Sequence, residues 1–229
     1  MKNYLIGMEI LAGILPETLE GLIRAGSVLE ADKGVVLIHA RQEAPCVFFQ
    51  LSGKSIIYNL THSGQRKILF IFGTGTLLNE RILNHHTSGV FCEVFEKSRI
   101  FKVPSAEFIA LMEKDIVLAK NILEAQEKKL WRLSHQLKNT TGGIYLEKKL
   151  ASKLWKLSRD FGMSTEKGIE IDMNMPISFL ADMLGVSRET TSRACSVLID
   201  YGLIVLEKKR ITIVNPERMS AFYKTGKIQ

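Results

Sequence analysis

The chain has 229 residues, of which 46% are hydrophobic, and a formal net charge of +7, so it is long enough for two domains with sizeable cores. No apolar run approaches the ~18 residues of a membrane-spanning helix, and the N-terminal residues do not follow the pattern of a signal peptide. The three cysteines are far apart, which argues against a disulfide framework and a zinc site, and we expect a cytoplasmic protein.

The positive charge is concentrated in the C-terminal part of the chain. From Lys138 onward there are 15 basic and 10 acidic residues, a net charge of +5, whereas the first 137 residues carry 16 and 14, a net charge of +2. An excess of this kind indicates a polyanionic partner for the C-terminal part.

The first half of the chain changes from a helical to a strand pattern. Within residues 3–26 apolar positions recur every three or four residues, which predicts short helices. From about 28 to 103 the chain consists of short β-branched and aromatic runs: VVLIHA, CVFFQL, SIIYNL, KILFIF, GVFCEVF and RIFKV. Turn signals separate them, among them Lys33-Gly34, Ser52-Gly53 and Ser63-Gly64. This spacing predicts an antiparallel β barrel or jelly roll.

Residues 105–138 contain neither Gly nor Pro and predict one long helix. Its apolar positions alternate by three and four residues, which is a heptad pattern: Ile116, Ala119, Leu123, Gln126, Leu130, Leu133 and Leu137. We interpret this narrow stripe as a helix pair across a dimer axis, in which Gln126 would specify the register. The alternative is a helix that packs only on its own β domain.

The C-terminal part begins with the glycine-containing break NTTGG at 139–143. A helix is predicted over 145–162, then a polar turn with a short strand in STEKGIEIDMNMP. Residues 177–204 predict a helix, a tight turn and a second helix, and VLEKKRITIV predicts a hairpin with a charged tip. We therefore expect an α+β protein with three parts: a β-barrel domain at 1–104, a dimerisation helix at 105–138 and a winged helix-turn-helix domain at 139–229.

The stretch GVSRETTSRACSVL carries the strongest functional signal. Gly185 can end the first helix sharply and Ser187 can cap the second. The helix before the turn is expected to bury Leu180, Ala181, Met183 and Leu184. The helix after it is expected to bury Thr191, Ala194, Cys195 and Leu198. The opposite face of this second helix presents Arg188, Glu189, Ser192 and Arg193, an arrangement that suits insertion into a DNA major groove.

These polar side chains match the chemistry of base recognition. Arginine can donate to guanine O6 and N7 while glutamate accepts from the cytosine amino group, so together they can read one G·C pair. Ser187 and Thr190 belong to the same predicted DNA-binding set. Lys208, Lys209 and Arg210 at the hairpin tip would contact phosphates and set position. The alternative is an ordinary solvated helix face.

With these motifs in this order, the chain resembles the Crp–Fnr family of bacterial transcription regulators over nearly its whole length. LGVSRETTSR is the most specific part, because it fits both R-E-T-x-x-R and E-x-x-S-R recognition-helix patterns. The resemblance implies a homodimer through residues 105–138, binding to double-stranded DNA, contact with RNA polymerase and no membrane association. It also implies an inverted repeat of TTGA-like half-sites.

The resemblance is less complete where the family's cyclic-nucleotide binders hold their ligand. Glu80 and Ser88 match a ligand-binding glutamate and serine, but Asn79 replaces a glycine and Thr87 replaces the phosphate-binding arginine. Without that arginine the charge-assisted phosphate clamp is missing, so we expect an effector other than cyclic AMP. The candidate effector residues, in a pocket between the barrel and the long helix, are Glu80, Thr87, Ser88, Ser134 and His135, although His135 also fits an exposed helical position.

Other sensing chemistries are less well supported. No cysteine precedes Cys46, so the thiolates for an N-terminal iron–sulfur cluster are missing. His85 and His86 as haem or metal ligands, and Cys46 with Cys92 as a thiol switch, stay open alternatives. A cupin-like enzyme would need an H-x-H motif that the sequence does not contain. We therefore predict a DNA-binding regulator without enzymatic activity; the alternatives are a ligand-independent regulator and a cyclic-nucleotide-responsive one.

Overall fold

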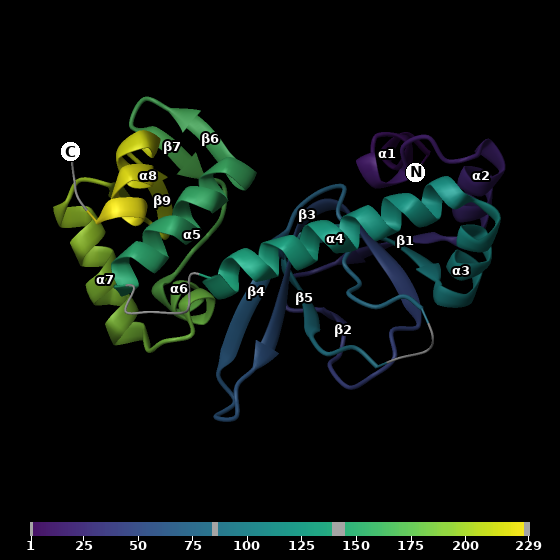
Figure 1. Ribbon diagram of the computed structural model, residues 1–229, viewed down its shortest axis with the longest axis horizontal. Coiled ribbons are helices and arrows are strands. Elements are labelled where there is room, and N and C mark those ends of the chain that lie inside the picture. Colours follow the sequence, from purple (N-terminus) through teal and green to yellow (C-terminus); the bar gives the residue numbers. More distant parts are fainter. Residues whose placement is uncertain (1, 84–86, 139–144, 227–229) are drawn as a thin grey trace. The chain divides into compact units, whose positions relative to one another are not determined.

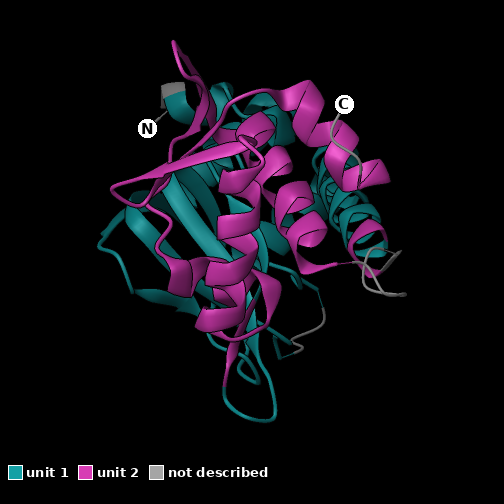
Figure 2. Ribbon diagram, turned by 90° about the vertical axis from the view of Figure 1, so that its left-hand side faces the viewer, with its two compact units in different colours: residues 1–64, 68–134 teal, residues 65–67, 135–229 magenta. Residues whose placement is uncertain are grey.

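The computed structural model describes residues 2–83, 87–138 and 145–226. Two units can be distinguished, residues 1–64 with 68–134 and residues 65–67 with 135–229 (Figure 2). Both contain helices and an antiparallel sheet, so the predicted α+β class is confirmed. His85, His86 and the predicted break at 139–143 lie outside the described residues.

Three short helical segments open the first unit, as the sequence predicts. They are α1 (Lys2–Ile6), the 3-10 helix η1 (Glu9–Leu11) and α2 (Pro16–Ala25). Pro16 occupies the first position of α2, where its missing N–H removes no helical hydrogen bond. Leu5, Leu11 and Leu22 from these segments are buried in the core of the unit.

The β domain is an antiparallel roll in which two long strands take the place of four short ones. Its strands are β1 (Ser27–Ala31), β2 (Val36–Ile38), β3 (Cys46–Leu60), β4 (Arg66–Phe72) and β5 (Phe91–Pro104). They pair in the order β1-β5-β3-β4, and β2 also pairs with β5. The predicted antiparallel roll is confirmed, whereas the prediction of separate strands in CVFFQL and SIIYNL is wrong.

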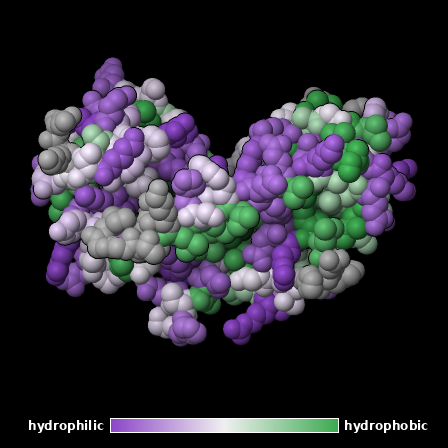
Figure 3. Space-filling view, in the orientation of Figure 1, coloured by the Kyte–Doolittle hydropathy of each residue, from purple (hydrophilic) through white to green (hydrophobic). Residues whose placement is uncertain are grey.

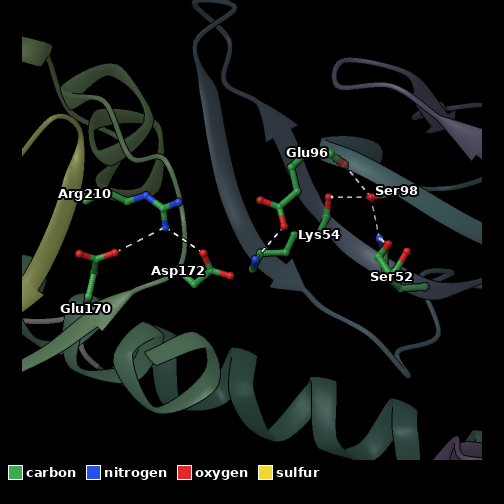
Figure 4. A network of polar contacts seen from close by, with 8 residues as sticks. Ser52, Lys54, Glu96, Ser98, Glu170, Asp172 and Arg210 are labelled. Atoms are coloured by element: carbon green, nitrogen blue, oxygen red, sulfur yellow. Dashed lines mark hydrogen bonds and ion pairs between the residues drawn. The ribbon is translucent and has the colours of Figure 1, made fainter. Parts of the chain in front are cut away.

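Gly53 explains this difference, because it marks an irregularity inside β3 and not a turn. The β3–β5 register shifts on both sides of it, and Gly53 has φ +79°, a conformation that glycine adopts without strain. A Cβ there would clash with Ser98 Oγ. Gln50 Nε2 donates to this Oγ at 2.9 Å. Lys54 pairs with Glu96 at 2.7 Å nearby (Figure 4). These contacts keep β3 and β5 paired across the irregularity.

The predicted helix over 105–138 is two helices, α3 (Ser105–Lys114) and α4 (Ile116–Lys138). The break is at Asp115, which has extended backbone dihedrals and whose Oδ1 accepts from the N–H groups of Val117 at 2.9 Å and Leu118 at 3.2 Å. Its Oδ2 accepts from Leu15 N–H at 2.8 Å. Asp115 is thus an N-cap that starts α4 and ties it to the N-terminal segment.

The core of the first unit joins the roll to these helices. Phe49, Phe101 and Phe108 are fully buried, with ring centroids 5.7 Å apart for Phe49 and Phe108. Leu118 and Ile122 of α4 pack against the same cluster, so α4 lies along the β domain (Figure 1). Among the described residues, no helix is long and apolar enough to cross a membrane.

The second unit is a helical cluster with a small sheet. Its helices are α5 (Leu146–Phe161), α6 (Ile177–Leu184), α7 (Arg188–Asp200) and α8 (Pro216–Thr225). Its strands β6 (Gly162–Thr165), β7 (Gly168–Ile171), β8 (Ile204–Glu207) and β9 (Arg210–Ile213) pair in the order β6-β7-β9-β8. The predicted helix-turn-helix and charged hairpin are present.

Two elements of this unit differ from the sequence prediction. Gly162–Thr165, read partly as a turn, is a strand that pairs with β7. Helix α8 was not predicted, although its boundaries carry ordinary signals. The side chain of Asn215 accepts from Arg218 N–H, Pro216 stands at the first helical turn and Gly226 ends the helix with φ +75°. Met219 and Phe222 of α8 are buried, which adds it to the core of the unit.

Candidate nucleic-acid interface and effector cavity

The turn between α6 and α7 has the geometry that the sequence predicts. Gly185 adopts the left-handed conformation at φ +73°, and its N–H donates to Ala181 O at 2.7 Å. Val186 N–H donates to the same oxygen at 3.3 Å, so the last turn of α6 closes tightly before the chain reverses. The expected inner residues of α6 are all buried: Leu180, Ala181, Met183 and Leu184.

Helix α7 has one buried and one exposed face, divided as its sequence predicts. The buried face consists of Thr191, Ala194, Cys195 and Leu198, each at most 5% exposed. Arg188, Glu189, Ser192 and Arg193 are exposed. Helix α7 therefore presents its polar N-terminal half to the surroundings of the unit, as a helix that enters a major groove does.

Glu189 and Arg193 form an ion pair one turn apart on this exposed face. Glu189 Oε1 accepts from Arg193 Nη2, and the two side chains are 76% and 77% exposed. Exposed i,i+4 pairs contribute little to stability, about 0.3–0.5 kcal/mol. The pair does hold a carboxylate beside a guanidinium, which are the groups needed for the two halves of a G·C pair. Arg188 forms no hydrogen bond or ion pair with the residues that the structure describes.

Ser187 and Thr190 cap α7. Ser187 Oγ accepts from Thr190 N–H at 3.1 Å and lies 2.8 Å from Thr190 Oγ1. Both side chains stay exposed, so they lie at the end of α7 that would approach DNA while they also fix its first turn.

The hairpin between β8 and β9 carries the two lysines of the predicted set at its tip. Lys208 and Lys209 both have positive φ, 48° and 69°, as a two-residue hairpin turn requires, and both are exposed. Arg210 differs from them, because its Nη1 lies 2.8 Å from Asp172 Oδ1 and 3.8 Å from Glu170 Oε1 (Figure 4). Its guanidinium is therefore engaged within the unit, whereas Lys208 and Lys209 lie exposed at the tip.

Helix α4 exposes a stripe of large apolar side chains that repeats every seven residues. Ile116, Leu123, Leu130 and Leu137 are 60–67% exposed, and Figure 3 shows a green patch over the C-terminal half of α4. Gln126, placed on the same stripe by the sequence, donates from its Nε2 to the backbone oxygen of Asn79 at 3.3 Å, and its role in a dimer register stays a prediction. One face of α4 thus packs on the β domain, and another is exposed in the single chain; pairing with a second copy stays a prediction.

The predicted effector residues do not surround one common cavity; most of them contact residues close by in the chain. Glu80 Oε1 accepts from Gly89 N–H at 2.6 Å, and the buried Ser88 hydrogen-bonds to the backbone of Val90. Thr87 is exposed, and its backbone forms an isolated antiparallel β-bridge with that of Glu43. On α4, Ser134 donates to Leu130 O at 3.1 Å, and His135 is exposed. The structure brings Glu80 close to Ser88 through Gly89.

A cavity of about 230 Å³ lies between α4, η1 and the segment after β4. The residues that line it are Glu9, Ile10, Phe72, Gly75, Thr76, Leu77, Asn121, Glu124, Ala125, Lys128, Lys129 and Arg132. None of the predicted effector residues is among them. The sequence did contain one signal for this cavity. On the face of α4 that packs on the β domain, a lysine follows three apolar residues at helical spacing: Leu118, Ile122, Ala125 and Lys129.

The cysteines are free thiols. Burial raises the pKa of the Cys92 thiol to about 12, opposed in part by Lys129, and burial raises the pKa of Cys195 to about 11. A thiol with such a pKa forms little reactive thiolate at neutral pH, which weakens the thiol-switch alternative. Among the described residues, no group of three His, Cys, Asp or Glu side chains is placed to hold a metal ion.

Comparison with known families matches both units. The family model of the cyclic nucleotide-binding domain matches residues 28–115, and that of the Crp-like helix-turn-helix domain matches residues 148–222. The second match contains α6, α7 and the β8–β9 hairpin, which are the elements that position the candidate DNA-binding residues.

Individual proteins agree with this assignment. The global nitrogen regulator of Synechococcus elongatus is 25% identical over 231 residues, which cover 96% of this chain and 96% of the relative. The fumarate and nitrate reduction regulatory protein of Salmonella typhi is 25% identical over 197 residues, 82% of this chain and 75% of the relative.

Solved structures share the fold. FixK2 from Bradyrhizobium japonicum has a TM-score of 0.73 at 18% identity, with 86% of this chain and 96% of that chain covered. A transcriptional regulator of the CRP/FNR family from Thermus thermophilus has a TM-score of 0.69 at 17% identity, with 87% and 99% covered. With both units matched in the order found in these regulators, the chain belongs to the Crp–Fnr family of DNA-binding transcriptional regulators.

Proposed function

We propose that this protein is a dimeric, sequence-specific regulator that reads an inverted repeat of TTGA-like half-sites and responds to a small effector other than cyclic AMP. The observation that carries the proposal is the exposed front of α7, where Glu189 and Arg193 lie side by side in the first turns of the second helix of the helix-turn-helix. In this reading Arg188, Glu189, Ser192 and Arg193 contact bases, Ser187 and Thr190 support the start of the helix, and Lys208 and Lys209 contact phosphates.

The proposed dimer rests on the uncovered stripe of α4. Four large apolar residues at seven-residue spacing supply one of the two core positions of a two-stranded coiled coil, and a second copy of the same helix offers a self-complementary partner. In the dimer two α7 helices would lie about 34 Å apart, in successive major grooves of one face of the duplex. This spacing is the reason for proposing an inverted repeat.

The proposed effector is a small molecule that does not need a cationic phosphate clamp. Loss of the phosphate-binding arginine, with Thr87 in its place, supports a ligand other than cyclic AMP. The sequence assignment of effector contacts to Glu80, Thr87, Ser88, Ser134 and His135 stays a prediction, as do contact with RNA polymerase and action in the cytoplasm. A regulator without any ligand is the second candidate, and tight site-specific binding that cell extract does not change would favour it.

The test is selection of bound sites from random DNA, followed by competition binding with variants. Glu189→Gln and Arg193→Gln should each lose about 1–3 kcal/mol of discrimination at one G·C pair per half-site. Lys208→Gln serves as the contrast, because loss of a phosphate contact should weaken all sequences alike and reduce the salt slope by about one.

Equal weakening of every sequence by the α7 variants would show that this helix does not read bases. Selected sites without two-fold symmetry would contradict the proposed dimer. Either outcome can be recognised without knowing the effector.

A further inference from the structure

Glu189 differs from the other polar side chains at the start of α7. Among residues 188–195, which the structure describes in full, it is the only one whose ionised side chain accepts hydrogen bonds but cannot donate them. Arg188 and Arg193 can only donate, and the hydroxyl of Ser192 can do both. Asp200, the other carboxylate of α7, is the last residue of the helix, about 16 Å further along. A base that contacts Glu189 must therefore present a donor.

In the free protein Arg193 supplies a donor to this carboxylate. Glu189 Oε1 accepts from Arg193 Nη2, and both side chains are exposed to water. Contact with DNA displaces that water, and a carboxylate left without a donor costs more free energy than a neutral acceptor does. In the complex proposed above, Arg193 donates to guanine, and the cytosine N4 amino group becomes the donor for Glu189. The contact of Glu189 with this base pair thus depends on one N–H group of cytosine.

The cytosine amino group has two N–H bonds, of which only one faces the major groove, because the other pairs with guanine O6. A methyl group on N4 leaves a single N–H bond, and the base pair needs it. The methyl group therefore takes the place of the donor in the major groove. A methyl group on C5 of the same ring lies close by but leaves the donor free. The two methylated cytosines thus separate loss of the donor from added bulk.

We propose that methylation of this cytosine at N4 weakens binding of the regulator to its DNA site, because it removes the donor for Glu189. The inference rests on the function proposed above and adds a chemical modification of the DNA that regulates the same contact. Each TTGA-like half-site contains one guanine, so two-fold symmetry places one of the paired cytosines on each strand of the inverted repeat. Methylation of one strand therefore affects one half-site, and methylation of both strands affects both.

The test is competition binding of the full chain to the duplex selected from random DNA, at one fixed salt concentration. Four versions of this duplex are compared: unmodified, with N4-methylcytosine on one strand, with N4-methylcytosine on both strands, and with 5-methylcytosine on both strands. We expect the dissociation constant to rise about tenfold for one methylated strand and about 100-fold for two, because a hydrogen bond to a charged acceptor is lost each time. The 5-methylcytosine duplex should bind within about threefold of the unmodified one.

Two variants assign this response to one side chain. Glu189→Ala should bind the fully N4-methylated and the unmodified duplex about equally, because alanine needs no donor. Glu189 is exposed, so this variant should fold. Arg188→Ala is the matched control, since it also shortens an exposed side chain on the first turn of α7 but removes no acceptor. It should weaken binding to every duplex and keep the ratio between methylated and unmodified DNA at about 100. A purely structural role of Glu189 would likewise leave this ratio unchanged.

The inference is overturned if N4-methylated and unmodified duplexes bind equally well, if 5-methylcytosine weakens binding as much as N4-methylcytosine does, or if Glu189→Ala keeps the response of the parent chain. Each of these outcomes leaves site-specific binding of the unmodified duplex, and hence the proposed function, intact. A chain that prefers no duplex over competitor DNA overturns the proposed function, and this inference with it.

Discussion

Substitution of Leu130 by alanine offers a quantitative test of the α4 dimer. Leu130 is 65% exposed in the single chain, and complete burial of a leucine side chain is worth about 1.5–3 kcal/mol. Coverage of the exposed part by a partner helix would contribute about 1–2 kcal/mol per protomer. Alanine keeps one carbon of the side chain, so the substitution should remove about 1 kcal/mol of this burial energy from each protomer. The dimer contains the substitution twice because it is two-fold symmetric. The expected loss is about 2 kcal/mol per dimer, a ~30-fold weaker dimerisation constant.

Sedimentation equilibrium over a range of protein concentrations measures this constant directly. Leu60→Ala is the matched control, because Leu60 is 46% exposed at the end of β3, away from the α4 stripe. The reasoning is refuted if the two variants dimerise equally well. It is also refuted if the parent chain is a monomer at tens of micromolar, where a coiled coil of three heptads should associate, at about −6 to −8 kcal/mol.

Two further predictions concern the turn and the cap. Gly185→Ala should lower the free energy of unfolding of the second unit by about 1–2 kcal/mol in urea denaturation, because alanine must adopt φ +73° there, and Gly185→Asn should lose less. Equal stability of the three proteins would argue against a strained turn. Asp115→Ala should cost about 1–3 kcal/mol, since it removes the cap of α4 and the acceptor for Leu15 N–H. Burial raises the pKa of Asp115, but hydrogen bonds from Leu15, Thr18, Leu118 and Val117 outweigh it and leave the pKa below its usual value. The carboxylate therefore stabilises fully above the unfolded pKa of about 3.9, and its contribution is lost as the pH falls through the lower folded pKa. The difference from the alanine variant should be constant from about pH 5 to 8 and shrink below about pH 4; a difference that grows on acidification would contradict this assignment.

Sequence periodicity predicted the buried residues correctly where a segment has one buried and one exposed face. The division of α7 into Thr191, Ala194, Cys195 and Leu198 on the inside and the charged residues on the outside is confirmed. The role of Gly185 followed from its position between two apolar helices, because few residues other than glycine adopt that backbone conformation.

Periodicity failed where tertiary contacts decided the local structure. Asp115 interrupts a segment without Gly or Pro: it caps α4 through the N–H groups of Val117 and Leu118, and its other carboxylate oxygen accepts from Leu15, one hundred residues away. Ser52-Gly53 is a turn signal in the sequence, and only the pairing of β3 with β5 shows that Gly53 lies inside a continuous strand. The cavity is harder still, because Phe72, Thr76 and Arg132 come from separate parts of the sequence, and only Lys129 on an otherwise apolar stripe indicated it.

The ion pair on α7 bears on how such a protein searches a genome. A free arginine would adhere to phosphates on any sequence, and a chromosome offers roughly 10⁶–10⁹ competing sites. Glu189 partly neutralises Arg193 and repels the same phosphates, so unspecific encounters should be brief. In the proposed complex the guanine and cytosine edges would replace this internal partner. If α7 reads bases as proposed, the carboxylate would shorten the time that the protein spends on wrong sequences, in addition to any hydrogen bond that it forms with a base.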